Sequence, residues 1–154
     1  MDKITFYASG KPAGQPRPRA FSIRQKAGKA LIRMYDPHTA DGWRAAVAAA
    51  ARPHIPTTPI CEPVTVRLAF WFERPLSHST KKGVRPNAPH WHTQKPDADN
   101  LAKAVLDELT NRGLWKDDTQ VASLVVTKRW GQLPGCAVEV DILATQGNTE
   151  GLGG

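Results

Sequence analysis

Two short segments combine acids and a lysine at spacings that suit metal-assisted chemistry. The first reads KPDADNLAK and the second WKDDTQV, and their candidate residues are Asp97, Asp99, Lys103, Asp117 and Asp118. Two carboxylates about 4 Å apart repel each other by roughly 4 kcal/mol at an effective dielectric constant of about 20. A cluster that tolerates this repulsion usually holds a divalent cation or shares a proton. The two segments therefore predict a cation site or a proton-sharing acid cluster.

A helix is expected to position the first segment. Pro96 biases the residue before it away from helical geometry, so the chain should approach the helix in an extended conformation. In extended chain, Asp97 and Asp99 would project to the same side. Either Asp99 or Asn100 is suited to cap the helix, which we expect over residues 100–112.

Helical spacing places further charged residues beside Asp99. Lys103 lies one turn beyond Asp99 and Asp107 one turn beyond Lys103, so all three should share one stripe of the helix. A purely structural interpretation also exists, in which Asp99 is a helix cap and Lys103 forms a surface ion pair with Asp107. In that interpretation Asp117 and Asp118 form a polar turn. The spacing alone leaves both interpretations open.

Two other kinds of metal site are disfavoured by the sequence. An EF-hand loop starting at Asp97 would place Leu101 and Ala102 at its fifth and sixth positions, where a ligand and a glycine are required. Residues 90–92 read HWH, but no cysteine or third histidine lies near them to complete a zinc site. We expect these histidines to be solvated loop residues or neighbours of DNA.

Basic residues are concentrated in two stretches that contain no acid, residues 4–34 and 74–96, whereas residues 97–118 hold six of the 14 acids. This layout suits phosphates held by cations beside carboxylates that hold a metal ion. The candidate DNA-binding residues in the basic stretches are Lys11, Arg17, Arg19, Arg24, Lys81, Lys82, Arg85 and Lys95.

The hydrophobic pattern predicts an α+β fold, a mixed β-sheet with two helices packed on one face. Residues 74–96 have no apolar period and are expected to form a flexible basic loop. The last two strands, joined by the turn-like GQLPG, should form a hairpin. The expected strands are residues 4–9, 30–35, 64–72, 121–130 and 136–143, and the expected helices are residues 37–52 and 100–112.

The chain has 154 residues, a formal net charge of +7 and two cysteines. This length suits one domain, expected over residues 1–145, with a disordered tail at 146–154. No segment approaches the about 20 apolar residues of a membrane span, and no signal peptide is evident, so we expect a cytoplasmic protein. Cys61 and Cys136 lie in or beside apolar runs and are expected to be buried thiols.

The sequence resembles the RusA family of Holliday junction resolvases over about residues 4–142. The resemblance rests on KPDADNLAKAVLDEL, WKDDTQV and TKRW, with GKPAGQPRPR and YDP also similar. It implies a homodimer of mixed α/β subunits that acts on four-way DNA junctions, in a family common in phage and prophage genomes. The implied magnesium-binding catalytic aspartates are Asp97, Asp99 and Asp118, and the implied essential lysine is Lys103. The role of Asp117 stays open.

The resemblance implies metal-assisted phosphodiester hydrolysis, in which the three aspartates hold one or two Mg²⁺ ions. Lys103 would stabilise charge on the phosphate or on the leaving group. A two-fold dimer would nick two opposed strands of the junction symmetrically. Two alternatives remain: a DNA-structure-binding protein without catalysis, and a metal-dependent nuclease acting on flaps or plain duplex. A membrane-surface protein is disfavoured because no basic helix has a large apolar face.

Overall fold

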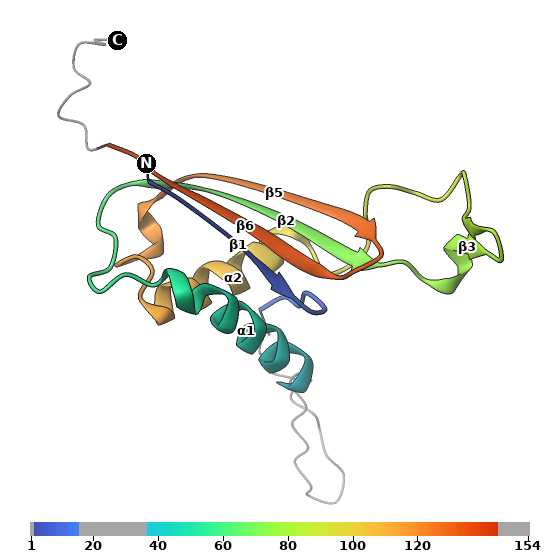
Figure 1. Cartoon of the computed structure of the whole chain (residues 1–154), viewed down its shortest axis with the longest axis horizontal. Helices are drawn as coiled ribbons and strands as arrows, with labels where there is room; N and C mark the ends of the chain where they lie inside the picture. Colours follow the sequence, from blue (N-terminus) through green and yellow to red (C-terminus); the bar gives the residue numbers. More distant parts are fainter. Residues whose placement is uncertain (1, 16–36, 145–154) are drawn as a thin grey trace, which may run out of the picture.

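The computed structural model describes residues 2–15 and 37–144 (Figure 1). Short 3₁₀ turns occur at Arg52–His54, Leu76–His78 and Asp118–Gln120. The predicted strand at 30–35 and the predicted tail at 146–154 lie outside the described residues. The principal elements are β1 (Lys3–Ser9), α1 (Pro37–Ala51), β2 (Val64–Glu73), β3 (Ser79–Thr80), β4 (Gly83–Val84), α2 (Ala98–Arg112), β5 (Val121–Gly131) and β6 (Gly135–Ile142).

Four strands form a mixed sheet in the order β1-β6-β2-β5. β6 pairs antiparallel with both β1 and β2, whereas β2 pairs parallel with β5. The predicted hairpin of the last two strands is therefore wrong, because β2 lies between β5 and β6. Alternate residues of β2 are buried from Val64 to Phe72. A strand with such an apolar face removes the most apolar surface from water when it lies at the centre of the sheet.

The hydrophobic core lies between one face of this sheet and the two helices (Figure 1). Trp43 of α1 packs 6.5 Å from Phe70 of β2, measured between ring centroids. The buried stripe of α2 includes Leu101, Val105 and Leu109, as the spacing predicts. The predicted fold class, a mixed sheet with two helices on one face, is confirmed.

The segment between β2 and α2 contains structure that the sequence pattern does not reveal. A 3₁₀ turn and the β3–β4 hairpin occur within it, and Figure 1 shows the hairpin projecting beyond one end of the sheet. The segment returns along β5, where the His92 N–H donates to the Lys128 carbonyl and the Trp130 N–H donates to the His90 carbonyl, each at 3.0 Å. Its flexibility stays a prediction.

Only one of the two cysteines fulfils the expectation of a buried thiol. Cys136 is fully buried in β6, and this burial raises the pKa of its thiol. Cys61 is exposed, which corrects the prediction. It follows the buried Ile60, which the backbone pairs with Trp115, and neighbouring residues in extended chain point to opposite sides. Across the described ranges 2–15 and 37–144, no helix is both long and apolar enough to cross a membrane.

Candidate active site

The first turn of α2 carries two of the candidate aspartates. Asp97 is the N-cap residue, with extended backbone (φ −69°, ψ 150°), and its carbonyl accepts the Leu101 N–H at 3.0 Å. Its side chain caps no backbone N–H. Asp99 lies in the first turn, where the positive end of the helix dipole favours a carboxylate. The chain approaches the helix in an extended conformation at Asp97, as predicted. The predictions that Asp99 or Asn100 caps the helix, and that Asp99 also lies in extended chain, are wrong because α2 begins at Ala98.

One cavity of about 480 Å³ brings together three candidates from different segments. Asp99 and Lys103 reach it from α2, and Asp118 reaches it from the 3₁₀ turn before β5. The Lys103 Nζ lies 3.8 Å from Asp107 Oδ2. The remaining cavity wall is apolar and consists of Ala98, Ala102, Leu106, Leu124 and Val126. Two acids and a lysine thus face a common space, and of the three Asp118 is the more buried while Asp99 and Lys103 are exposed.

Asp117 and Asp118 have different surroundings despite being adjacent. Asp117 caps the 3₁₀ turn: its Oδ1 accepts the Thr119 N–H at 2.9 Å, and its own N–H donates to Gln120 Oε1 at 2.8 Å. The Gln120 side chain also donates to the carbonyls of Ile60 and Glu62, which fixes the turn against the start of β2. These bonds leave Asp118 to line the cavity, so we assign Asp117 a positioning role.

The charges around Asp118 favour a cation in this cavity. Burial raises the pKa of Asp118, and the negative charges of Asp117 and Asp107 raise it further, while Lys103 opposes them. The backbone N–H of Thr119 instead lowers the pKa of Asp117. A site whose carboxylate is disfavoured by neighbouring carboxylates gains from a bound cation.

The oxygen donors of the cavity suit magnesium, which usually takes one or two carboxylates together with water and substrate phosphate. Asp99 and Asp118 are such a pair. Over the part of the chain that the structure describes, no three His, Cys, Asp or Glu side chains are close enough to hold one ion together. Asp97 does not line the cavity shared by Asp99 and Asp118. It lines two other cavities, one of which shares Ala98 with that cavity.

Lys128 positions the segment that leads to Asp97. Its Nζ donates to the Gln94 carbonyl at 2.7 Å and to the Pro96 carbonyl at 2.6 Å. Burial lowers the pKa of Lys128, and the charge of Asp97 acts in the opposite direction. The sequence pattern alone predicts no role for this lysine, although it lies in the TKRW segment that carries part of the family resemblance.

The N-terminal GKPAGQ segment packs against the start of α2. The Gln15 N–H donates to the Asn100 carbonyl at 3.4 Å, and the Asn100 side chain lies where a Cβ on residue 14 would be, so any larger residue at Gly14 would displace the Asn100 amide. A cavity of about 840 Å³ opens beside this contact. Lys11, Lys95 and Asp97 are among its lining residues, so two predicted DNA contacts lie close to a candidate catalytic acid.

His92 is buried, which corrects the expectation of a solvated loop histidine. Its ring stacks on Phe72 at 4.0 Å between centroids and lies 4.5 Å from Trp130. Burial lowers the pKa of His92, and the nearby Lys128 charge lowers it further. Trp130 and Trp43 also belong to the core, whereas Trp71 lies on the other face of the sheet.

The other basic candidates do not line the cavity of Asp99 and Asp118, or lie outside the described residues. Lys81 and Lys82 form the exposed turn of the β3–β4 hairpin. The exposed Arg85 follows β4, and its Nε donates to the Ser77 carbonyl at 3.0 Å. The remaining candidates, which the structure does not describe, are Arg17, Arg19 and Arg24.

Comparison with known proteins identifies the family. The model of the family "Endodeoxyribonuclease RusA" matches residues 9–141. The uncharacterized protein YqaN of Bacillus subtilis (strain 168) is 37% identical over 143 residues, an alignment covering 91% of this chain and 96% of YqaN. The family match includes α2, the 3₁₀ turn of Asp118 and all of β5, so it spans the whole acidic cavity. The chain therefore belongs to the RusA endodeoxyribonuclease family.

Proposed function

We propose that this protein is a Mg²⁺-dependent Holliday junction resolvase that makes symmetric nicks in four-way DNA junctions during recombination and repair. The observation that carries the proposal is the shared cavity of Asp99, Lys103 and Asp118, in a chain of the RusA family. Carboxylates and a lysine at the mouth of an apolar-walled cavity suit the hydrolysis of a phosphodiester bond.

The residues of the cavity have distinct roles in this proposal. Asp99 and Asp118 hold the metal ion, and Asp97 joins them from the N-cap position when substrate is bound. Magnesium, when bound, neutralises charge on the scissile phosphate and lowers the pKa of a water molecule. Lys103 donates to a phosphate oxygen or to the leaving oxygen, so the charge that develops during bond breaking meets a fixed cation.

A homodimer would place one such cavity on each of two opposed strands of the junction. The edge of β5 suits contact with a second copy because its residues 122–125 are exposed and uncharged. Leu124 and Val125 are 41% and 43% exposed. Proteins usually cover or charge an apolar sheet edge of this kind, because it otherwise invites pairing with another strand. Antiparallel pairing of two β5 edges would bury both side chains. Leu124 also lines the catalytic cavity, so the two sites would face the same dimer axis.

The Val125→Lys variant tests this contact. Like charges would then meet across the two-fold axis, so sedimentation should show a monomer where the parent protein is a dimer. Leu76→Lys, which adds the same charge at a residue that is 92% exposed in the 3₁₀ turn after β2, is the control. A Val125→Lys protein that remains fully dimeric would exclude the β5 edge as the contact.

The activity is tested with purified protein on a labelled synthetic four-way junction and on a linear duplex of the same sequence. Each substrate is incubated with Mg²⁺, with EDTA, and with the Asp118→Asn variant. We expect paired nicks in opposed strands of the junction alone, lost with EDTA or with the variant. The nicked ends should carry 5′-phosphates and 3′-hydroxyls.

The same assay separates the alternatives. Cleavage of linear duplex or of flaps at a rate equal to that of the junction would favour a general metal-dependent nuclease. Tight junction binding without nicks in Mg²⁺ or Mn²⁺ would favour a non-catalytic DNA-structure-binding protein, and the catalytic roles of Asp97, Asp99, Lys103 and Asp118 would then be wrong.

A further inference from the structure

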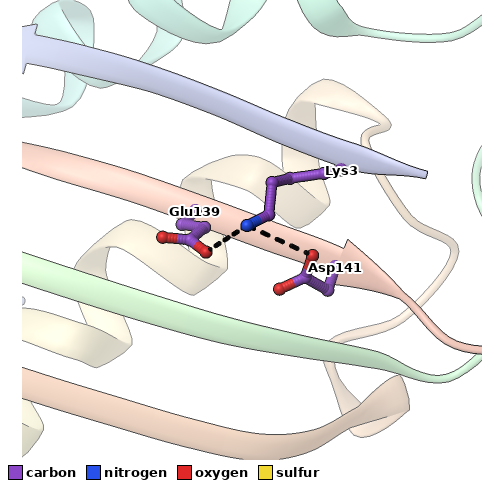
Figure 2. Close-up of polar contacts among 3 residues, drawn as sticks. All are labelled: Lys3, Glu139 and Asp141. Atoms are coloured by element: carbon purple, nitrogen blue, oxygen red, sulfur yellow. Dashed lines mark hydrogen bonds and ion pairs between the residues drawn. The ribbon is translucent and has the colours of Figure 1, made fainter. Parts of the chain in front are cut away.

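The sheet face that points away from α1 and α2 carries a second set of nucleic-acid-compatible side chains. In Figure 2 the side chains of Lys3, Glu139 and Asp141 stand on this face, with helices visible behind the strands. Within residues 2–15 and 37–144, the two α-helices pack on the opposite face (Figure 1). We call the uncovered surface the open face.

Four side chains form a row across one end of the open face, which we call the aromatic row: Tyr7, Trp71, Arg129 and Trp91. The ring of Tyr7 lies 6.4 Å from that of Trp71, and the guanidinium of Arg129 lies 5.8 Å from the centre of the Trp71 ring and 5.2 Å from that of Trp91. Arg129 is the backbone partner of Trp71 on one side and of Trp91 on the other. The row therefore extends from β1 across the sheet to the edge beyond β5.

Two glycines make room for this arrangement. A Cβ on Gly135 would collide with the Tyr7 hydroxyl, and a Cβ on Gly131 would come within 2.8 Å of Trp71 Cδ1. Neither glycine has a positive φ, so these positions require the absence of a side chain rather than an unusual backbone. The rings consequently lie low across the sheet surface instead of standing upright from it.

The aromatic row is accessible and carries the positive charge of Arg129, and the exposed Glu73 follows Trp71 by two residues on the same face of β2. Trp91 is 52% exposed and Tyr7 is 45% exposed, large fractions for aromatic residues. At the other end of the open face, Lys3 Nζ pairs with Glu139 at 2.8 Å and with Asp141 at 3.8 Å (Figure 2). Lys3 therefore partly neutralises the charges of Glu139 and Asp141. The guanidinium of Arg129 then supplies a positive charge within the row, which favours the approach of an anion.

We propose that the aromatic row binds unpaired bases of single-stranded DNA by stacking. Aromatic rings and guanidinium planes stack on bases of any sequence, and an arginine at the same place attracts the phosphates between them. The net charge of +7 favours a polyanion as the ligand.

Tyr7, Trp71 and Arg129 lie on the face of the sheet opposite to the cavity of Asp99 and Asp118. Trp91, at the edge beyond β5, also lines the neighbouring cavity of Asp97. Leu124 and Val126 line the cavity, whereas Arg129 is an odd number of residues away and points to the open face. The inference goes beyond the proposed cleavage activity, since it concerns the capture of a strand whose bases have separated. It predicts binding without metal and without an intact catalytic cavity.

The test measures the fluorescence anisotropy of a short labelled oligothymidine in EDTA, with the Asp118→Asn protein as the parent. An abasic strand of the same length offers the same phosphates and no bases. We expect the parent to bind oligothymidine at least about 10-fold more tightly than the abasic strand. Adding Trp91→Leu should remove most of this preference, whereas Trp91→Phe should retain it. Leu76→Ala, at a residue 92% exposed outside the row, is the control and should change nothing.

Three results would overturn the proposal: equal binding of both strands by the parent, an unchanged preference in the Trp91→Leu protein, or a Trp91→Leu protein that loses its dimer in sedimentation. The last result would make the open face a contact between copies. Because no cleavage occurs in EDTA, failure of the proposed nuclease activity on the junction leaves this test unaffected.

Discussion

Lys128 and Pro96 are connected by a 2.6 Å hydrogen bond from the lysine Nζ to the proline carbonyl, immediately before Asp97. The same ammonium also binds the Gln94 carbonyl, so β5 holds the entry to α2 in place. A side chain of one strand therefore fixes the backbone that presents a candidate catalytic acid on another element.

Lys128→Met should lower the cleavage rate on the junction by about 10-fold or more, because groups that orient metal ligands usually contribute that much. The Mg²⁺ concentration needed for half-maximal cleavage should rise as well, a change that simple destabilisation would not cause. Arg52→Met removes one positive charge at an exposed position in another element and serves as the control. A normal magnesium dependence in a folded Lys128→Met protein would refute the positioning role.

Asp117 and Asp118 should respond differently to substitution. Asp117→Ala removes the cap of the 3₁₀ turn and should lower the melting temperature, while cleavage well below that temperature is largely retained. Asp118→Asn should abolish cleavage and leave stability unchanged or slightly higher, because its neighbours disfavour the carboxylate in the folded protein. Thermal melting and junction cleavage of both variants check this, and equal losses of activity would contradict it.

Acid should destabilise the fold through His92. Burial lowers the pKa of His92 in the folded protein from the ordinary value of 6.5, so the unfolded chain binds the proton more readily. The stability contributed by the neutral ring is therefore complete above about pH 6.5 and is lost as the pH falls toward the folded-state pKa. Urea midpoints at pH 7.5 and pH 5 measure the loss.

The His92→Phe variant should show a smaller drop in the urea midpoint over this range, since the titrating group is gone while the stack on Phe72 remains possible. His90→Phe changes the exposed neighbour and should keep the parental dependence. If His92→Phe shows the same drop in the urea midpoint between pH 7.5 and pH 5 as the parent, a titrating group other than His92 causes the loss of stability in acid.

Gly14 and Asn100 should behave as a coupled pair. Gly14→Ala forces the Asn100 side chain to move and should cost about 1–3 kcal/mol, as other overpacking substitutions do. In the Asn100→Ala background, the same Gly14→Ala change should cost much less. Urea denaturation of the two single variants and the double variant gives the coupling energy, and additive losses would show that the contact is unimportant.

The β3–β4 hairpin should contribute electrostatic contacts to DNA. Replacing Lys81 and Lys82 together by alanine should flatten the dependence of junction affinity on salt, by up to about 0.9 in the log–log slope for each phosphate that the variant no longer neutralises. Binding at several salt concentrations measures the slope. An unchanged slope would mean that these lysines do not bind phosphates.

The sequence by itself determined the features that depend on neighbouring residues. The alternation of β2 and the helical stripe of α2 follow from local periodicity, and both are present as predicted. The fold class follows from the same elements, because an apolar sheet face needs helices to cover it. The motif around Asp97 and Asp118 likewise indicated the family that the comparison establishes.

Only the tertiary structure decided which elements meet. β2 lies between β5 and β6 because this position buries its apolar face at the centre of the sheet. The short GQLPG connection instead suggests that β5 and β6 pair directly, since it contains no information about β2. The burial of His92 depends on the return of its segment along β5. The different surroundings of Asp117 and Asp118 depend on a turn fixed by Gln120 to Ile60, residues 60 positions apart. Local pattern specifies which face of an element is apolar, but the partner of that face is chosen by the packing of the whole chain.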